Sequence, residues 1–198
     1  MALPVPCSRR DGKKTRGWSL RREVWGKNKQ ITFFPASDIV LPIDMQAKAV
    51  MFDTNIFNRI LDGKIDIDSL NRNFSYYVTH IQCDEICKTK DFVRKERLKA
   101  VFKKVPQSQV PTESAVIGIS RVDECKISDG SFYKEIRSLL DSKKKDKNNC
   151  KNALIAEMPI KNGCILVTDD CALKETVIEL GGKAVSSAEF KRMTNIVE

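Results

Sequence analysis

The sequence predicts an α/β domain built on a mostly parallel sheet. Short apolar runs with the composition of buried strands alternate along the chain with segments whose apolar residues recur at helical spacing. The chain has 198 residues, 41% of them hydrophobic, which suits one α/β core of roughly 150 residues with an extension. Strands that alternate with helices usually pair in parallel. We therefore expect one doubly wound domain over residues 47–198, preceded by an extension over residues 1–46.

The first part of the predicted domain has the pattern strand, helix, strand, helix. Residues 49–52 form an apolar strand run, and residues 56–61 place apolar side chains on one helical face before a polar Asp-Gly pair ends the pattern. Residues 76–78 predict a second strand. Thr79 and Gln82 have the spacing of a capping box, which predicts that a second helix begins there.

The middle of the chain predicts two more helices and one strand. The charged stretch 91–104 is helical in pattern, and its candidate apolar face consists of Val93, Leu98, Val101 and Phe102. A strand run follows at 114–119. Residues 132–140 predict an amphipathic helix. A lysine-rich polar connection follows at 143–149.

The last part of the chain repeats the alternation. Residues 152–160 predict an apolar helix, and Gly163 lies where a C′ glycine belongs. A buried strand is predicted at 165–168, then a helix to about Leu180, and a last strand at 183–185.

The charge of the chain favours a polyanionic partner. There are 35 Lys and Arg against 26 Asp and Glu, a formal net charge of +9, and the excess is concentrated in residues 1–30. That basic segment is either a nucleic-acid tether or a solvated tail. No apolar run has the length of a secretory core or a membrane span, so we expect a cytoplasmic protein without a membrane partner. Seven cysteines without paired CxxC spacing predict reduced thiols, and Cys83 and Cys87 are predicted to form neither a disulfide nor a zinc site.

Three acids lie where the chemistry of such a fold is expected. Asp53 follows the first strand, Glu85 lies early in the helix after the second, and Asp170 lies two residues after the strand that ends at Thr168. Ligands of open parallel sheets bind beyond the carboxyl ends of the strands. Carboxylates gathered there repel one another unless divalent cations neutralise them, which favours Mg²⁺ or Mn²⁺ and hydrolysis of a phosphodiester. Taken singly, the two aspartates could instead be helix caps and the glutamate a solvated helix residue.

Four segments resemble the motifs of PIN-domain nucleases, the VapC-like endoribonucleases. They are Phe52-Asp53-Thr54-Asn55-Ile56-Phe57, His80-Ile81-Gln82-Cys83-Asp84-Glu85-Ile86, Asn152-Ala153-Leu154-Ile155-Ala156-Glu157 and Leu166-Val167-Thr168-Asp169-Asp170. The resemblance spans about residues 48–187. It implies a parallel sheet flanked by helices and an endoribonuclease that uses Mg²⁺ or Mn²⁺. The partners it implies are RNA, an antitoxin protein and a second copy of the chain.

The resemblance also implies roles for individual residues. The metal-site acids are Asp53, Glu85 and Asp170, and position 152 belongs to the same catalytic set. The polar supports are Thr54, Asn55, Thr168 and Asp169.

Position 152 departs from the family pattern, which has an aspartate where this chain has Asn152. An amide oxygen can ligate a cation but brings no charge, so metal affinity and water activation should both decrease. Three interpretations are open. One is a deliberate change that disarms a toxic enzyme for production, the second is a naturally inactive homologue, and the third is a true variant in which Glu157 or Asp169 takes the role instead.

The substrate that these features favour is single-stranded or looped RNA, whose backbone can bend into an acidic cleft. The phosphate-binding candidates are Lys143, Lys144, Lys145 and Lys147, although such a run is also typical of a solvated loop. A haloacid-dehalogenase-like phosphatase is a weaker alternative because Asn55 stands where its second aspartate belongs. A non-catalytic PIN-like module for RNA binding or assembly is the alternative from another class.

Overall fold

The computed structural model describes residues 49–68, 70 and 74–195, which form a five-stranded parallel sheet with seven helices. The strand order is β3-β2-β1-β4-β5, and every neighbouring pair is parallel. The strands are β1 (Ala49–Phe52), β2 (Ser75–Val78), β3 (Gln107–Gln109), β4 (Ile165–Val167) and β5 (Lys183–Val185). The helices are α2 (Thr54–Leu61), α3 (His80–Cys87), α4 (Phe92–Lys104), α5 (Ser131–Lys143), α6 (Asn149–Asn162), α7 (Cys171–Glu179) and α8 (Ser187–Asn195).

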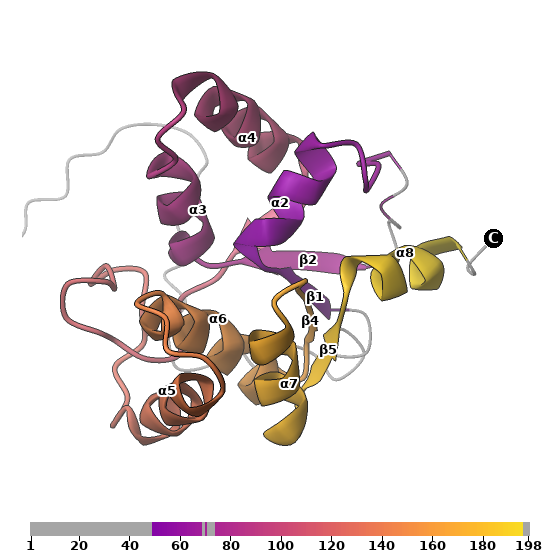
Figure 1. Ribbon diagram of the computed structural model, residues 1–198. Helices are drawn as coiled ribbons and strands as arrows, with labels where there is room; N and C mark the ends of the chain where they lie inside the picture. Colours follow the sequence, from indigo (N-terminus) through magenta and orange to yellow (C-terminus); the bar gives the residue numbers. More distant parts are fainter. Residues whose placement is uncertain (1–48, 69, 71–73, 196–198) are drawn as a thin grey trace, which may run out of the picture. The chain divides into compact units, whose positions relative to one another are not determined.

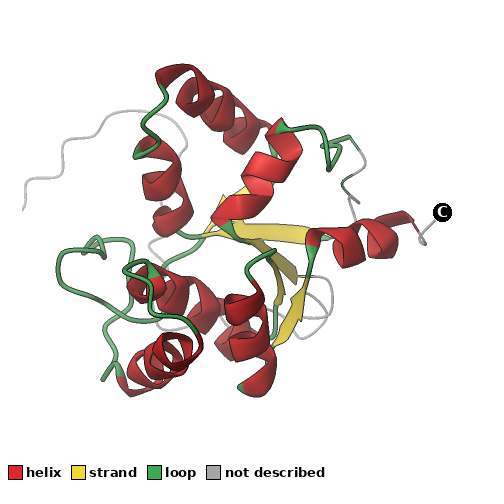
Figure 2. Cartoon of the chain, viewed as in Figure 1, coloured by secondary structure: helices red, strands yellow, loops and turns green. Residues whose placement is uncertain are grey.

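The predicted fold class, an α/β domain with a parallel sheet flanked by helices, is confirmed by this arrangement (Figures 1 and 2). The predicted extension over residues 1–46, with its basic residues, lies outside the described part of the chain. No helix within the described residues combines the length and the apolar character that a membrane crossing needs.

The central strand β1 is fully enclosed because helices cover both faces of the sheet (Figure 1). Its side chains alternate between two cores, as the period of a strand requires. Ala49 and Met51 join the core formed with α5, α6 and α7, whereas Val50 and Phe52 join the core formed with α2, α4 and α8. A strand buried on both faces is apolar throughout, which is why β1 was predictable from a four-residue run.

Polar contacts at the helix starts fix the carboxyl edge of the sheet. The capping box of α3 is formed, with Thr79 and Gln82 bonded in both directions. The Gln82 side chain also donates to the carbonyl oxygen of Phe52 at 3.0 Å. This bond ties the start of α3 to the end of β1 and thereby positions the helix that carries Glu85. Asp53 and Asp170 cap α2 and α7.

The prediction of a strand at 114–119 is wrong. The third strand of the sheet is Gln107–Gln109, an edge strand whose only partner is β2. Its side chains are polar and mostly exposed, so the strand is held in the sheet by backbone pairing. Such a strand has no apolar pattern that the sequence could reveal. Residues 114–119 form turns, with Gly118 at φ +80° and Ile117 fully exposed.

Two further expectations about helices need correction. Val93 does not lie on the apolar face of α4, since it is 59% exposed while Leu98 on the same helix is buried. Helix α8 was not predicted, although Phe190 from it is buried against Phe52 at a ring-centroid distance of 5.5 Å.

The two isoleucines Ile136 and Ile117 give a test of this fold. Ile136→Ala removes a fully buried side chain of α5 and should lower the free energy of unfolding by about 2–5 kcal/mol, because it leaves a cavity in the core. Ile117→Ala should change it by less than about 0.5 kcal/mol because that side chain is exposed. Urea unfolding of both variants measures this, and equal losses would contradict the turn assigned at 114–119.

Candidate active site

The predicted acids lie at the point where the strand order of the sheet reverses. From β1 the chain continues to β2 and β3 on one side, whereas β4 and β5 lie on the other side of β1. Asp53 directly follows β1, and Asp170 follows β4, its neighbour. The gap between such strands is where open α/β sheets bind ligands. The sequence therefore places two carboxylates at the expected binding crevice.

Asp53 is the buried centre of the site. Its side chain accepts hydrogen bonds from the Thr54 backbone amide at 2.6 Å, from Asn55 Nδ2 at 2.6 Å and from Thr168 Oγ1 at 2.7 Å. Thr168 also accepts from the backbone amide of Asp170 at 3.1 Å. The supports Thr54, Asn55 and Thr168 thus hold Asp53 and link it to the loop that carries Asp170.

Glu85 reaches the same site from α3. Its Oε2 accepts a hydrogen bond from Thr54 Oγ1 at 2.5 Å, so Thr54 bonds Asp53 through its backbone and Glu85 through its hydroxyl. The Lys151 ammonium lies 3.2 Å from the other Glu85 oxygen, Oε1. Glu85 is therefore held between a hydroxyl from α2 and a cation from α6.

The charges of this cluster act on one another. The pKa of Asp53 is raised to about 7, chiefly by burial and also by the negative charges of Glu85 and Asp170, while hydrogen bonds from Thr168 and Thr54 oppose the rise. The three acids thus lie within electrostatic range, although they are 32 and 85 residues apart along the chain. A buried acid whose pKa is raised by neighbouring acids is typical of functional sites.

Asn152 is half-buried in the first turn of α6, directly after Lys151. Within the described residues its side chain makes no hydrogen bond, so the amide is free for another partner. The alternatives proposed for its role are both engaged elsewhere. Glu157 is fully buried and accepts from Ser114 Oγ at 2.8 Å and from Lys161 Nζ at 2.7 Å.

Asp169 is engaged in holding the C-terminal helix. It pairs with Arg59 Nε at 2.7 Å and accepts from the backbone amide and the hydroxyl of Ser187, each at 2.9 Å. Partial burial acts to raise the pKa of Asp169, but the bonds from Ser187 and Arg59 outweigh it and keep the pKa below its usual value. Asp169 is a structural support here, and its contacts leave it poorly placed to replace an aspartate at position 152.

A polar pocket of about 670 Å³ opens beside Asp170. It is lined by Asn55, Arg59, Lys143, Lys144, Asp169, Asp170, Cys171, Ala172 and Glu175. Lys143 and Lys144 thus border the pocket, whereas Lys145 and Lys147 are exposed and do not line it. Lys143 pairs with Glu179 at 2.9 Å, and Lys144 lies 3.6 Å from Asp146. To bind a phosphate, Lys143 would have to leave Glu179 and Lys144 would have to leave Asp146.

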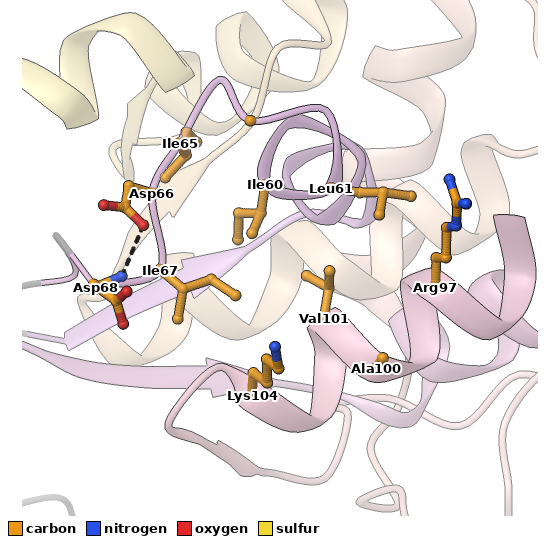
Figure 3. Close-up of a pocket in the computed structure, with 11 residues that line it drawn as sticks. Ile60, Leu61, Ile65, Asp66, Ile67, Asp68, Arg97, Ala100, Val101 and Lys104 are labelled. Carbon is orange, nitrogen blue, oxygen red and sulfur yellow. Dashed lines mark hydrogen bonds between the residues drawn. The ribbon is translucent and has the colours of Figure 1, made fainter.

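A second pocket lies between the end of α2, the loop after it and α4 (Figure 3). Its walls are mostly apolar, with Ile60, Ile65, Ile67 and Val101 pointing into it and Lys104 beside them. None of the predicted site residues lines this pocket. The polar pocket is lined instead by residues predicted for the site, among them Asn55, Asp169 and Asp170.

The donor set fits a hard divalent cation, since carboxylate oxygens are the ligands that Mg²⁺ and Mn²⁺ prefer. In the described part of the chain, however, no three Asp, Glu, His or Cys side chains are arranged to hold a metal ion. Both Asp53 and Glu85 direct their oxygens to hydrogen-bond donors of the protein. Binding of a cation would require at least one of these carboxylates to turn. Cys83 and Cys87 are free thiols, and their inability to bind zinc stays a prediction.

Sequence reasoning missed Lys151 and Arg59. A signal for Lys151 was available, because a cation in the first turn of a helix opposes the helix dipole and needs an acid nearby. Arg59 carried no such signal. It lies in the last turn of α2, where a basic residue is ordinary, and its partner Asp169 is 110 residues away.

Comparison with known proteins gave structural matches alone. No family model and no curated protein matches the chain. Eleven chains of solved structures match it. One belongs to VapBC2 from Rickettsia felis bound to a DNA fragment from their promoter, with 19% identity and a TM-score of 0.42 over 70% of this chain and 98% of that chain. A match at this level indicates no activity or partner for the present chain.

The pKa of Asp53 predicts how stability depends on pH. Because the folded state holds this proton up to about pH 7 and the unfolded chain releases it near pH 3.8, stability should fall as pH rises between these values. The slope from this group is at most about 1.4 kcal/mol per pH unit. Asp53→Asn, which cannot ionise, should flatten the curve. Urea unfolding in EDTA at pH 5, 6, 7 and 8 measures the free energy of unfolding of the unchanged chain and of Asp53→Asn. The same dependence on pH in both proteins would contradict the raised pKa of Asp53.

Proposed function

We propose that the chain is an endoribonuclease of the PIN type that depends on Mg²⁺ or Mn²⁺. The observation that carries this proposal is the buried carboxylate of Asp53, whose pKa is raised towards neutrality by burial and by Glu85 and Asp170 at the switch in strand order. Burying repelling acids destabilises a fold, so their retention at a ligand-binding crevice favours a cationic cofactor. The order of the motifs along the sequence supports the same interpretation.

The residues of the site take distinct roles in this proposal. Asp53, Glu85 and Asp170 hold the cation, with the amide oxygen of Asn152 as an uncharged fourth donor. Thr54, Asn55 and Thr168 orient the carboxylates through the hydrogen bonds described above. When bound, the cation would activate a water and stabilise charge on the phosphodiester. Asn152 lacks the negative charge of the aspartate in the family pattern. The site is therefore less negative, and we expect weaker activity.

The substrate in this proposal is RNA. The polar pocket beside Asp170 is bordered by Arg59, Lys143 and Lys144, cations that suit a phosphate backbone. An unpaired strand can bend into such a pocket, whereas a regular duplex cannot bring its backbone there without distortion. A toxin role, an antitoxin partner, a homodimer and a cytoplasmic location are further parts of the proposal, and they rest on the family resemblance alone.

A non-catalytic RNA-binding module is the second candidate. It is favoured by the cation Lys151 on Glu85, by the amide at position 152 and by the lack of a preformed three-ligand group among the described residues. In this case the acid cluster would be a remnant that Lys151 keeps stable. The two candidates differ in whether restoring an acid at position 152 produces cleavage.

The two functions are separated by RNA cleavage assays on Asn152→Asp. This change adds a carboxylate to the cluster, strengthens cation binding and should raise the cleavage rate by about tenfold or more over the chain with Asn152. Asp53→Asn in the Asn152→Asp background should abolish cleavage. A fluorescent single-stranded RNA with Mg²⁺ or Mn²⁺ reports the rate, and EDTA should remove it.

The controls define the outcome. Glu157→Gln removes the charge of the glutamate in α6 that contacts Ser114 and Lys161. This substitution should leave the cleavage rate unchanged if the protein stays folded. An Asn152→Asp protein that is silent on diverse RNAs would support the non-catalytic module. A chain with Asn152 that cleaves as fast as Asn152→Asp would show that position 152 has no part in the chemistry.

A further inference from the structure

The acid cluster contains one cation of the protein itself, Lys151. Its ammonium group lies 3.2 Å from Glu85 Oε1, and the side chains of Lys151 and Glu85 are only 22% and 19% exposed. Within the described residues, no other ion pair joins a basic side chain to Asp53, Glu85 or Asp170. This contact connects α6 to α3 across the site. It differs in burial from the ion pairs on the exposed helix faces, such as Lys99 with Glu96.

The place of Lys151 in its helix is unfavourable unless an acid lies nearby. It occupies the first turn of α6, where the partial positive charge of the helix repels cations, and that turn contains no acid. A half-buried lysine also loses side-chain entropy and hydration. The charge of Glu85, 3.2 Å away, offsets these effects. The acid cluster and the lysine therefore stabilise each other.

We propose that Lys151 is the built-in counter-cation of this site, holding Glu85 in the place of a divalent ion and competing with any such ion for its carboxylate. With all three acids ionised their formal charge is −3, and Lys151 reduces it to −2, the charge that one divalent ion neutralises. Asn152, the next residue, adds no charge. The pair Lys151 and Asn152 thus sets the site for a single ion. The competition with metal rests on the proposed function, whereas the pairing with Glu85 does not.

The first experiment measures metal binding directly. Mn²⁺ is titrated into the full chain and free Mn²⁺ is counted by electron paramagnetic resonance. Lys151→Met keeps the apolar stem but removes the ammonium, so the Kd for Mn²⁺ should fall by about tenfold or more while the stoichiometry stays at one ion. Lys99→Met removes an exposed lysine of an ion pair on α4 and should leave the Kd unchanged. An unchanged or higher Kd in Lys151→Met would overturn the competition.

The second experiment needs no metal and separates this inference from the proposed function. In EDTA, Lys151→Met should lower the melting temperature by about 3 °C or more, because it leaves the Glu85 charge partly buried without a cation. Adding Glu85→Gln to Lys151→Met removes that charge and should recover most of the loss. Lys99→Met should have no comparable effect. A melting temperature unchanged by Lys151→Met, or a loss that Glu85→Gln does not recover, would overturn the counter-cation role.

The two experiments fail in different ways. If no form binds Mn²⁺ but the melting temperatures follow the pattern above, Lys151 is the counter-cation of a site without metal, and the metal-dependent function is overturned. If Mn²⁺ binds the unchanged chain and Lys151→Met equally, the proposed function stands and the competition is overturned.

Discussion

The buried carboxylate of Asp53 is the interaction on which the rest of the site depends. It ends the central strand, begins α2, and accepts hydrogen bonds from Thr54, Asn55 and Thr168. Thr168 belongs to the loop after β4, so the Asp53 carboxylate joins the ends of β1 and β4, the two strands at which the strand order reverses. Without these donors an acid at such a position would be too unfavourable to bury.

Burial of Asp53 creates an electrostatic conflict that the neighbouring residues partly resolve. Glu85 and Asp170 add negative charge and raise the pKa of Asp53 towards neutrality. Protonation of Asp53, a bound divalent ion and the ammonium of Lys151 are three ways to relieve this repulsion. In the proposed function, a divalent ion and the ammonium of Lys151 compete for this role, and the uncharged Asn152 weakens the binding of the ion.

Most of the fold was predictable because its central elements are buried on both sides. The apolar runs of β1 and β4 and the capping box of α3 were each placed correctly from the sequence, since burial and local hydrogen bonding leave patterns in a few residues. The edge strand β3 left none, because the polar residues Gln107–Gln109 are held by backbone bonds to β2. Helix α8 was missed because Phe190 is its one buried apolar residue among those described, and the bonds from Ser187 to Asp169 that also hold it leave no apolar pattern.

The sequence was enough to predict that the three acids gather at one edge of the sheet, but not which cations contact them. Asp53 and Asp170 follow strands, and Glu85 lies on the helix that Gln82 fixes to the end of β1, so topology alone brings them to one edge. The contacts of Lys151 and Arg59 depend on how helices pack across long sequence separations, which local patterns do not encode.

Anomalous X-ray diffraction from crystals of the protein soaked in Mn²⁺ tests most directly whether these acids form a metal site. We expect one anomalous peak within about 2.3 Å of carboxylate oxygens of Asp53, Glu85 and Asp170, with Glu85 turned away from Lys151. Crystals that bind Mn²⁺ at other carboxylates but show no peak between these residues would contradict it.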